Sequence, residues 1–328
     1  MTATVTATGT DARIALLFPG QGAQQPGMGL AWLDSPHWSV VDRLSAATGR
    51  DVRHLLTTAD AETLRRTDNA QLATFALEAM VFEAVRAAVP GLPVVCCAGH
   101  SLGEYGALLA AGVLGLEQVG RLVAARGDAM AEAARSNPGT MAVLLGGDRA
   151  ALTDLAEDLR AAGEQVWVAN LNGPGQTVVS GSVAGVEALS GRASGTGARV
   201  VRIPVGGAFH SPFMEPAKAA LAAAFDQVDA GTARVPVFAN VDAAAHLGDT
   251  AGEWRGLALA QLVSPVRWEQ SVRNMLELPS PPTELVELGP GAVLANLTRR
   301  IAPELSATSV GTPAQVAELA GRWAEALV

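Results

Sequence analysis

The chain has 328 residues, of which 49% are hydrophobic and 17% charged, so it holds enough apolar material for one large core or two unequal ones, which excludes disorder. Its 23 basic and 32 acidic residues give a net charge of −9, which argues against a nucleic-acid partner, since such a partner needs a surplus of positive charge. The long uncharged stretch 165–186 is interrupted by two asparagines and a Gly-Pro-Gly turn, so we expect no membrane span and no membrane partner.

The N-terminal segment carries no targeting signal, and the cysteines form no evident site. Residues 1–11 contain neither a basic residue nor an apolar segment, which argues against a secretory signal or a transit peptide, so we expect a cytoplasmic protein. Cys96 and Cys97 are adjacent in an apolar run, where a disulfide between neighbours is strained and further metal ligands are lacking. Both cysteines are therefore expected in the core.

Apolar runs of strand length alternate with longer helical patterns, which predicts an α/β fold with a largely parallel sheet. A first buried strand at 14–18 ends in the tight loop 19–22, and α/β proteins bind ligands at such loops after the carboxyl ends of strands. Apolar residues at spacings of three and four predict a helix over 69–89 with one buried face. A second buried strand at 93–98 runs directly into a Gly-rich turn at 99–103 and a further helix.

The middle of the chain has a different pattern, in which the order βαββαβ predicts a ferredoxin-like subdomain. Its expected elements are strand 140–145, helix 149–162, strands 165–170 and 177–182, helix 183–192 and strand 199–205. We expect this subdomain to comprise residues 139–206, inserted in a large subdomain formed by residues 12–138 and 207–328. After the insert, the pattern predicts a helix at 215–225, a strand at 235–240 and a last strand at 284–288.

The segment Gly99-His100-Ser101-Leu102-Gly103 fits the G-x-S-x-G pattern of a nucleophile elbow, in which glycines permit a strained turn from strand to helix that presents the serine Oγ. The N-terminus of the following helix would stabilise negative charge that develops near this oxygen. The position of the pattern between a buried strand and a helix makes Ser101 the candidate nucleophile. The competing interpretation is a chance match in a chain with 35 glycines.

A serine hydroxyl needs a base to attack at neutral pH, and the chain offers five histidines for that role. Three of them lie in polar, loop-like surroundings: His37, His54 and His246. His100 adjoins the serine but should project from another side of the elbow. His210 lies between a predicted strand and a helix, in a loop where Gly206 and Gly207 permit close approach to another backbone. It is therefore the candidate base, with an ordinary loop histidine as the alternative.

Several segments together resemble, in order along the chain, the motifs of malonyl-CoA:acyl carrier protein transacylases and polyketide-synthase acyltransferase domains. They are residues 18–24, 99–104, 125–130, 172–176, 208–211, 261–268 and 287–291. The resemblance covers nearly the whole chain. It implies an α/β-hydrolase-like catalytic subdomain with a ferredoxin-like insert, which agrees with the predicted order of the strands.

The resemblance also implies a two-step acyl transfer. Ser101 would take the acyl group from coenzyme A as an ester, with His210 as general base and then general acid. The backbone N–H groups of Gln21 and Leu102 would form the oxyanion hole. The family has no acidic third member, and its histidine is oriented by main-chain carbonyls near the position of Gln261.

Substrate choice in the family depends on an arginine in an Arg-Gly-x-x-Met context, which matches Arg126 here. A guanidinium can hold the malonyl carboxylate with two parallel hydrogen bonds. Without the resemblance, Arg126 would be interpreted as a solvated helix residue. Gln71 is similar to another pocket-lining position, although Leu72 stands where the family usually has proline.

Phe209 lies in the motif Ala208-Phe209-His210-Ser211, which resembles the malonyl-selecting form, where phenylalanine occupies the space that a 2-methyl branch needs. Gly206 and Gly207 stand where synthase domains often carry a larger side chain, so the pocket is expected to be roomier than the motif alone suggests. One methylene is worth only about 1–3 kcal/mol of discrimination in such a pocket.

The implied substrates are malonyl-CoA and an acyl carrier protein that supplies its own phosphopantetheine, in fatty-acid or polyketide biosynthesis. No metal or other cofactor is expected, and the length fits a free-standing monomer. Carrier proteins are acidic and this chain has a net charge of −9, so docking needs a local positive patch. The candidates for that patch are Arg199, Arg202, Arg299 and Arg300.

Other functions stay open. The enzyme could move another acyl unit between carrier proteins or act as a hydrolase that clears stalled carriers. Arg126 discriminates against these functions, because a site for uncharged acyl chains has no use for a buried cation. A non-catalytic carrier-binding module is a third interpretation, which the joint presence of Ser101 and His210 argues against.

Overall fold

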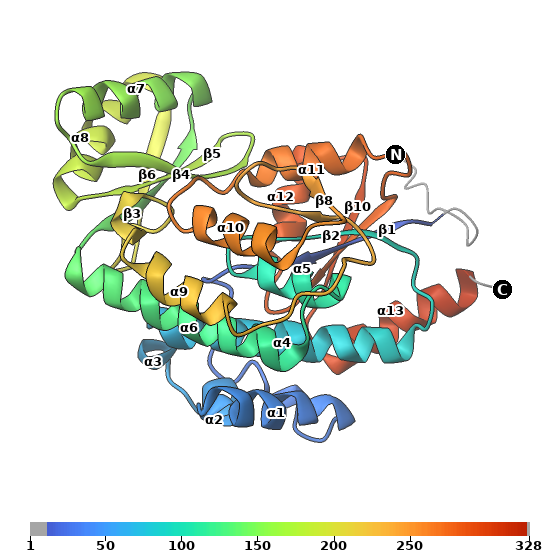
Figure 1. The fold of residues 1–328 in the computed structure, drawn as a ribbon. Coiled ribbons are helices and arrows are strands. Elements are labelled where there is room, and N and C mark those ends of the chain that lie inside the picture. The colour runs from blue at the N-terminus through green and yellow to red at the C-terminus, as the bar shows by residue number, and fades with distance from the viewer. Residues whose placement is uncertain (1–11, 327–328) are drawn as a thin grey trace.

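A six-stranded sheet forms the centre of the computed structural model, which describes residues 12–326 (Figure 1). In spatial order its strands are β10 (Ser306–Val310), β9 (Glu284–Leu288), β1 (Ile14–Phe18), β2 (Val94–Gly99), β7 (Val237–Phe238) and β8 (Ala245–His246). Every pairing is parallel except the antiparallel pair of β7 and β8. The α/β class and the largely parallel sheet are confirmed.

Helices cover both faces of this sheet, so the central strand β1 is buried throughout. Leu16 and Phe18 pack into one apolar cluster, while Ala15 and Leu17 pack into a second, because side chains alternate along a strand. The helices around the sheet are α4 (Thr67–Ala88), α5 (Gly103–Ala111), α6 (Leu116–Ser136), α9 (Ala217–Phe225), α10 (Ala251–Gln261), α11 (Trp268–Leu276), α12 (Val293–Ile301) and α13 (Pro313–Ala326). Of these, α4, α5, α12 and α13 contact its strands. None of the helices in residues 12–326 is long and apolar enough to cross a membrane.

The long helix α4 is buried almost all round, rather than along the single face that its apolar spacing predicted. It contacts α6, α13 and strand β9 of the sheet. Three shorter helices lie beside it: α1 (Ser39–Thr48), α2 (Val52–Thr57) and α3 (Ala61–Arg65). Because neighbours surround α4, polar side chains such as Gln71 and Glu78 are buried with the apolar ones.

A second, antiparallel sheet lies at one end of the molecule (Figure 1). Its strand order is β4-β5-β3-β6, with bounds Val166–Gly173, Gln176–Gly181, Thr140–Gly146 and Ala198–Ile203. Helices α7 (Arg149–Ala161) and α8 (Val183–Ala193) pack on it over a separate apolar cluster. The chain order of these elements is the βαββαβ pattern that the sequence predicts, while the exact subdomain boundaries stay a prediction.

The C-terminal part of the sheet differs from the sequence prediction. The strand at 284–288 is not the last one, because β10 follows and pairs with β9 at the edge of the sheet. Its sequence, Ser-Ala-Thr-Ser-Val, is short and polar, which suits an edge strand but gives little apolar signal. The expected strand at 235–240 is paired only at Val237–Phe238.

Candidate active site

Ser101 lies in a tight turn between the end of β2 at Gly99 and the start of α5 at Gly103. Its φ of +53° places it in the left-handed region that side chains rarely adopt. A Cβ on Gly99 would lie 1.8 Å from the carbonyl carbon of Gly103, and one on Gly103 would lie 1.9 Å from the carbonyl oxygen of Phe18. Both glycines are therefore needed because backbone meets backbone at this turn.

His210 contacts Ser101 directly, with 2.8 Å between His210 Nε2 and Ser101 Oγ. Its Nδ1 lies 2.9 Å from the carbonyl oxygen of Gln261. Because a carbonyl only accepts hydrogen bonds, Nδ1 carries the proton and Nε2 offers its lone pair to the hydroxyl. Burial and, after it, the nearby Arg126 cation lower the pKa of His210 to about 3, so the imidazole is neutral at pH 7.

Arg126 is almost completely buried beside the same hydroxyl, with only 1% of its surface exposed. Its Nη2 donates to Ser101 Oγ at 3.0 Å and to Gln261 Oε1 at 2.8 Å, and its Nη1 donates to Gln71 Oε1 at 2.6 Å. These acceptors are uncharged. Burial lowers the pKa of Arg126, while Tyr105 and Glu104 nearby oppose that shift. The acceptors of its hydrogen bonds thus carry no charge, and the buried Glu104 carboxyl nearby, whose pKa is raised to about 7, offsets the charge of Arg126 only in part.

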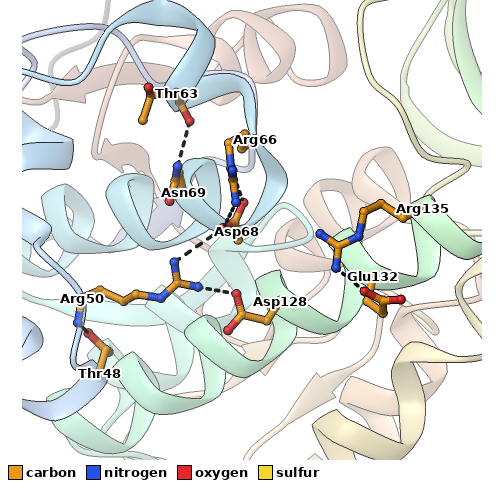
Figure 2. Close-up of polar contacts among 9 residues, drawn as sticks. All are labelled: Thr48, Arg50, Thr63, Arg66, Asp68, Asn69, Asp128, Glu132 and Arg135. Atoms are coloured by element: carbon orange, nitrogen blue, oxygen red, sulfur yellow. Dashed lines mark hydrogen bonds and ion pairs between the residues drawn. The ribbon is translucent and has the colours of Figure 1, made fainter.

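Helices α4 and α6 hold Gln71 and Arg126 at this distance because they approach each other closely. A Cβ on Gly127 would lie 3.0 Å from Cα of Asp68 on α4, which explains the glycine after Arg126. An ion-pair group reinforces the crossing: Arg50 bridges Asp68 on α4 and Asp128 on α6, and Arg66 also pairs with Asp68 (Figure 2). Sequence patterns do not predict this ion-pair group, because its members are far apart in the chain.

Asn240 is a further residue of the site, and it was not among the residues predicted from the sequence. It follows strand β7, and its side-chain Oδ1 accepts the Ser101 N–H at 2.6 Å. Its Nδ2 donates to the carbonyl oxygen of Gly99 at 2.7 Å. The signal available in the sequence was its position at the carboxyl end of a predicted strand beside the strand that leads to Ser101.

The predicted oxyanion donors, Gln21 and Leu102, lie on either side of the elbow. Leu102 precedes α5, and the loop that holds Gln21 packs against the elbow so tightly that a Cβ on Gly20 would lie 2.6 Å from the carbonyl oxygen of His100. Within residues 12–326, the backbone N–H of neither Gln21 nor Leu102 donates to a protein group. Both donors are therefore available to a ligand oxygen.

A cleft of about 590 Å³ opens in front of Ser101, between the two sheets. The large sheet and its helices contribute Gln21, Gln71, Ser101, Arg126, Phe209 and His210 to the lining, and the small sheet contributes Met141, Val143, Asn170, Val178 and Ile203. Of the expected pocket residues, Gln261 is buried and contacts the site through its hydrogen bonds to Arg126 and His210. The structure thus brings every predicted site residue to one place.

The expected extra room at Gly206 and Gly207 is only partly present. A Cβ on Gly207 would lie 2.7 Å from the ring of Phe209 and 2.9 Å from Ala134, so the phenylalanine ring already fills that space. Nothing lies within 4 Å of a Cβ on Gly206.

Within the described residues, no histidine other than His210 hydrogen-bonds to the serine Oγ. His100 adjoins Ser101 and lines the same cleft, but its Nε2 contacts Asn172 Oδ1 at 2.9 Å. His54 belongs to helix α2 rather than to a loop, and His246 contacts the carboxylates of Asp242 and Asp249. Residues 12–326 contain no cluster of three or more histidine, cysteine, aspartate or glutamate side chains that could hold a metal ion.

A strained serine after a buried parallel strand, bonded to a neutral histidine, defines the nucleophile-elbow class of α/β enzymes. A profile described as "Acyl transferase domain" matches residues 15–326. Among curated proteins, the malonyl CoA-acyl carrier protein transacylase of Bacillus subtilis is 36% identical over 92% of this chain and 94% of its own length. That of Escherichia coli is 35% identical over 93% of this chain and 98% of its own. The chain belongs to the acyl transferase domain family.

Solved structures agree with this assignment. An acyl-carrier-protein-S-malonyltransferase from Bartonella henselae matches with a TM-score of 0.88 and 33% identity, over 95% of this chain and 99% of that one. A malonyl-transacylase solved in complex with its type II PKS acyl-carrier protein also matches with a TM-score of 0.88 and 33% identity, over 95% of this chain and 100% of that one.

Proposed function

We propose that this chain transfers a malonyl group from coenzyme A to the phosphopantetheine thiol of an acyl carrier protein, through an ester on Ser101. The observation that carries the proposal is the joint contact of Ser101 Oγ with His210 Nε2 at 2.8 Å and with Arg126 Nη2 at 3.0 Å. The nucleophile, its base and a cation that can bind the free malonyl carboxylate therefore meet at the Ser101 oxygen. The relatives named above carry malonyl transfer in their names.

In the first step, Ser101 Oγ attacks the thioester carbonyl while His210 Nε2 accepts the hydroxyl proton. The C–S bond then breaks, and His210 returns the proton to the departing coenzyme A thiolate. In the second step, His210 takes the proton of the carrier thiol, whose sulfur attacks the carbonyl carbon of the seryl ester. The bond between that carbon and Ser101 Oγ then breaks, and His210 returns the proton to Ser101 Oγ. The Gln261 carbonyl holds the His210 ring throughout, in place of an acidic residue.

The backbone N–H groups of Gln21 and Leu102 stabilise the oxyanion in both steps. Hydrogen-bond donors that point at the oxygen on which negative charge develops stabilise the transition state more than the bound substrate. Arg126 binds the free malonyl carboxylate with its fork of donors. To do so, it exchanges its hydrogen bond to Ser101 Oγ for the substrate. A site for uncharged acyl chains has no use for this cation, so transfer of a neutral acyl unit or its hydrolysis has less support.

The second substrate is an acyl carrier protein, as in the relative solved with its carrier. Of the arginines suggested for docking, Arg202 pairs with Glu187, and Arg299 donates to Asn296 and to the carbonyl of Ala307. Arg199 and Arg300 are exposed and take part in no such contact within residues 12–326, so they are the stronger candidates. The cytoplasmic location, the monomeric state and the independence from a metal or other cofactor stay predictions.

Replacement of Ser101 by alanine tests the proposal, because it removes the only oxygen that the mechanism acylates. The wild-type enzyme incubated with malonyl-CoA should gain the mass of one malonyl group, and the S101A variant should gain none by intact mass spectrometry. If the S101A variant is still labelled, another residue carries the acyl group and the proposal is wrong.

A further inference from the structure

The elbow that presents Ser101 is held by a side chain from a different strand. Ser101 has a left-handed backbone, which costs free energy for a residue with a Cβ and persists only where the surroundings enforce it. The Asn240 amide spans the turn, with Oδ1 on the Ser101 N–H at 2.6 Å and Nδ2 on the Gly99 carbonyl at 2.7 Å. It therefore joins the residue that enters the elbow to the nucleophile itself.

The backbone of Asn240 is fixed as firmly as its side chain. Its N–H donates to Glu104 Oε2 at 2.6 Å, and Glu104 is part of α5, the helix that leaves the elbow. Its carbonyl oxygen accepts the N–H of Arg267, just before α11, at 3.0 Å. Asn240 is only 1% exposed, and both polar atoms of its side chain and both of its backbone have partners. Such a fully satisfied buried network rigidifies its surroundings.

We propose that Asn240 is a positioning residue that holds Ser101 Oγ in line with His210, and that Glu104 holds Asn240 in turn. This inference rests on the proposed function, in which Ser101 carries the acyl group. Because Asn240 takes the N–H of Ser101, that donor does not face the substrate, and the adjacent Leu102 N–H is left to bind the oxyanion. Loss of the amide should therefore slow the chemical step more than it weakens the binding of malonyl-CoA, which uses Arg126.

The first test is the Asn240→Ala variant of the full-length enzyme, studied by rapid quench and intact mass. The rate constant of malonyl-enzyme formation should fall about 100-fold, because small misplacements of reacting atoms have effects of that size. The apparent Kd for malonyl-CoA, taken from the dependence of the acylation rate constant on malonyl-CoA concentration, should change less than about threefold, because the substrate-binding groups stay in place. A wild-type acylation rate in the folded variant would overturn the proposal.

The Asn240→Asp variant tests the role of the amide through the pH dependence of the acylation rate, which a purely structural role of Asn240 would not change. An ionised aspartate can accept the Ser101 N–H, but its other oxygen then faces the Gly99 carbonyl and repels it. A protonated aspartate can donate to that carbonyl and restore the bridge. The acylation rate of N240D relative to wild type should therefore rise about tenfold or more as the pH falls from about 8 to about 5.

A second background separates the titration of neighbouring groups from that effect. Glu104 accepts the backbone N–H of Asn240, and Arg126 and Asp242 act in turn on Glu104, whose pKa burial raises to about 7. Because Glu104 titrates in the same pH range and would couple to a new carboxylate at position 240, the comparison is repeated in the E104Q background, with N240D/E104Q measured against E104Q. The pKa of His210 is lowered to about 3, so the base of the wild-type enzyme stays neutral across this range. If N240D is equally slow relative to wild type at every pH, the amide bridge is not what positions Ser101. This comparison also decides the question if N240A does not fold.

Asn274→Ala is the matched control. Asn274 is another asparagine that holds the same loop, since its Nδ2 donates to the carbonyl of Ala243 at 2.9 Å, but it does not contact the elbow. The N274A variant should lose stability yet acylate at the wild-type rate, and a loss equal to that of N240A would overturn the proposal. S101A separates the two hypotheses: labelling of S101A contradicts the proposed function, whereas normal acylation by N240A contradicts only the role of Asn240.

Discussion

Arg126 is buried in the cleft with its hydrogen bonds directed to uncharged oxygens of Ser101, Gln71 and Gln261. A buried cation is costly unless a counter-charge or strong hydrogen bonds compensate it. Here, neutral side chains accept the hydrogen bonds, and Glu104 is a nearby carboxyl that acts on the cation. Under the proposed function, glutamine instead of glutamate at position 71 leaves charge on Arg126 for the free carboxylate of the substrate.

Gln71→Glu should test this view, because the new carboxylate would neutralise Arg126 and compete for the donors that the malonyl group needs. We expect kcat/KM for malonyl-CoA to fall about 10- to 100-fold, the range for loss of a charged hydrogen bond. Acetyl-CoA has no carboxylate, so its transfer should fall much less. Acyl-enzyme formation with both thioesters, followed by mass spectrometry, measures the two values.

Arg126→Ala is the reference for that experiment, because it removes the guanidinium itself. It should also lower malonyl transfer far more than acetyl transfer. Equal losses for both substrates in the two variants would mean that Arg126 supports the fold of the site but does not select the substrate.

At the scale of elements, the turn from β2 to α5 depends on backbone contacts that admit no side chain. Gly103→Ala would place a Cβ 1.9 Å from the carbonyl oxygen of Phe18, so β1 and α5 would have to separate. We expect the free energy of unfolding to fall by about 3 kcal/mol or more, at the upper end of overpacking effects. Chemical denaturation followed by circular dichroism measures it.

Gly191→Ala in α8 is the matched control, because nothing lies within 4 Å of its added Cβ. It should raise the free energy of unfolding by roughly 0.5–1 kcal/mol, since alanine is the better helix former. If both variants unfold at the same denaturant concentration, close backbone contact is not the reason for the glycine at 103.

Local sequence patterns predict a helix or strand well where each of its faces is either wholly buried or wholly exposed. They fail where contacts with distant elements determine which side chains are buried or which strands pair. The buried strands β1 and β2 and the βαββαβ order follow from apolar runs and turn residues. Helix α4 keeps polar residues such as Gln71 and Glu78 in its buried surface, because other elements supply their environment. Strand β10 was missed because pairing with β9, rather than its own composition, makes it a strand.

The whole molecule carries buried carboxyl groups outside the proposed mechanism. Glu78 has no exposed surface, and neither of its side-chain oxygens has a hydrogen-bond partner within the described residues. Glu287 is also buried and accepts the N–H groups of Leu294 and Ala295 at the start of α12. Burial, and then the nearby Glu287, raise the pKa of Glu78 well above its ordinary value. Folding therefore keeps a proton on Glu78 that the unfolded chain releases.

This difference gives stability a defined dependence on pH. The contribution of protonated Glu78 to folding stability is fully present below the ordinary pKa of a glutamate. It is lost as the pH rises toward the raised pKa of Glu78 in the folded protein. The free energy of unfolding should fall in that window by up to about 1.4 kcal/mol per pH unit. Glu78→Gln removes the titration, so the stability of E78Q relative to wild type should increase steadily from about pH 5 to about pH 8, as measured by denaturant titration at each pH.

Glu117→Gln provides the comparison. Glu117 is half-exposed, and its hydrogen bond with Arg43 lowers its pKa, so its contribution is lost only as the pH falls below the ordinary value. The stability of E117Q relative to wild type should stay constant over the same pH range. A constant difference for E78Q as well would show that Glu78 is ionised in the folded protein.

Features that depend on neighbours along the chain can be predicted from the sequence. A buried strand, a turn with spaced glycines and a following helix predict the elbow with Ser101 as nucleophile, the loop with Gly206 and Gly207 predicts His210 as the base, and the resemblance implies Arg126. The tertiary structure alone decided that His210, 109 residues away, touches Ser101, that Gln261 contacts Ser101, Arg126 and His210 at once, and that Asn240 holds the turn. These contacts join segments that are distant in the chain. The order of the strands in the sheet and the burial of the helices around it bring these segments together, and short-range sequence patterns specify neither.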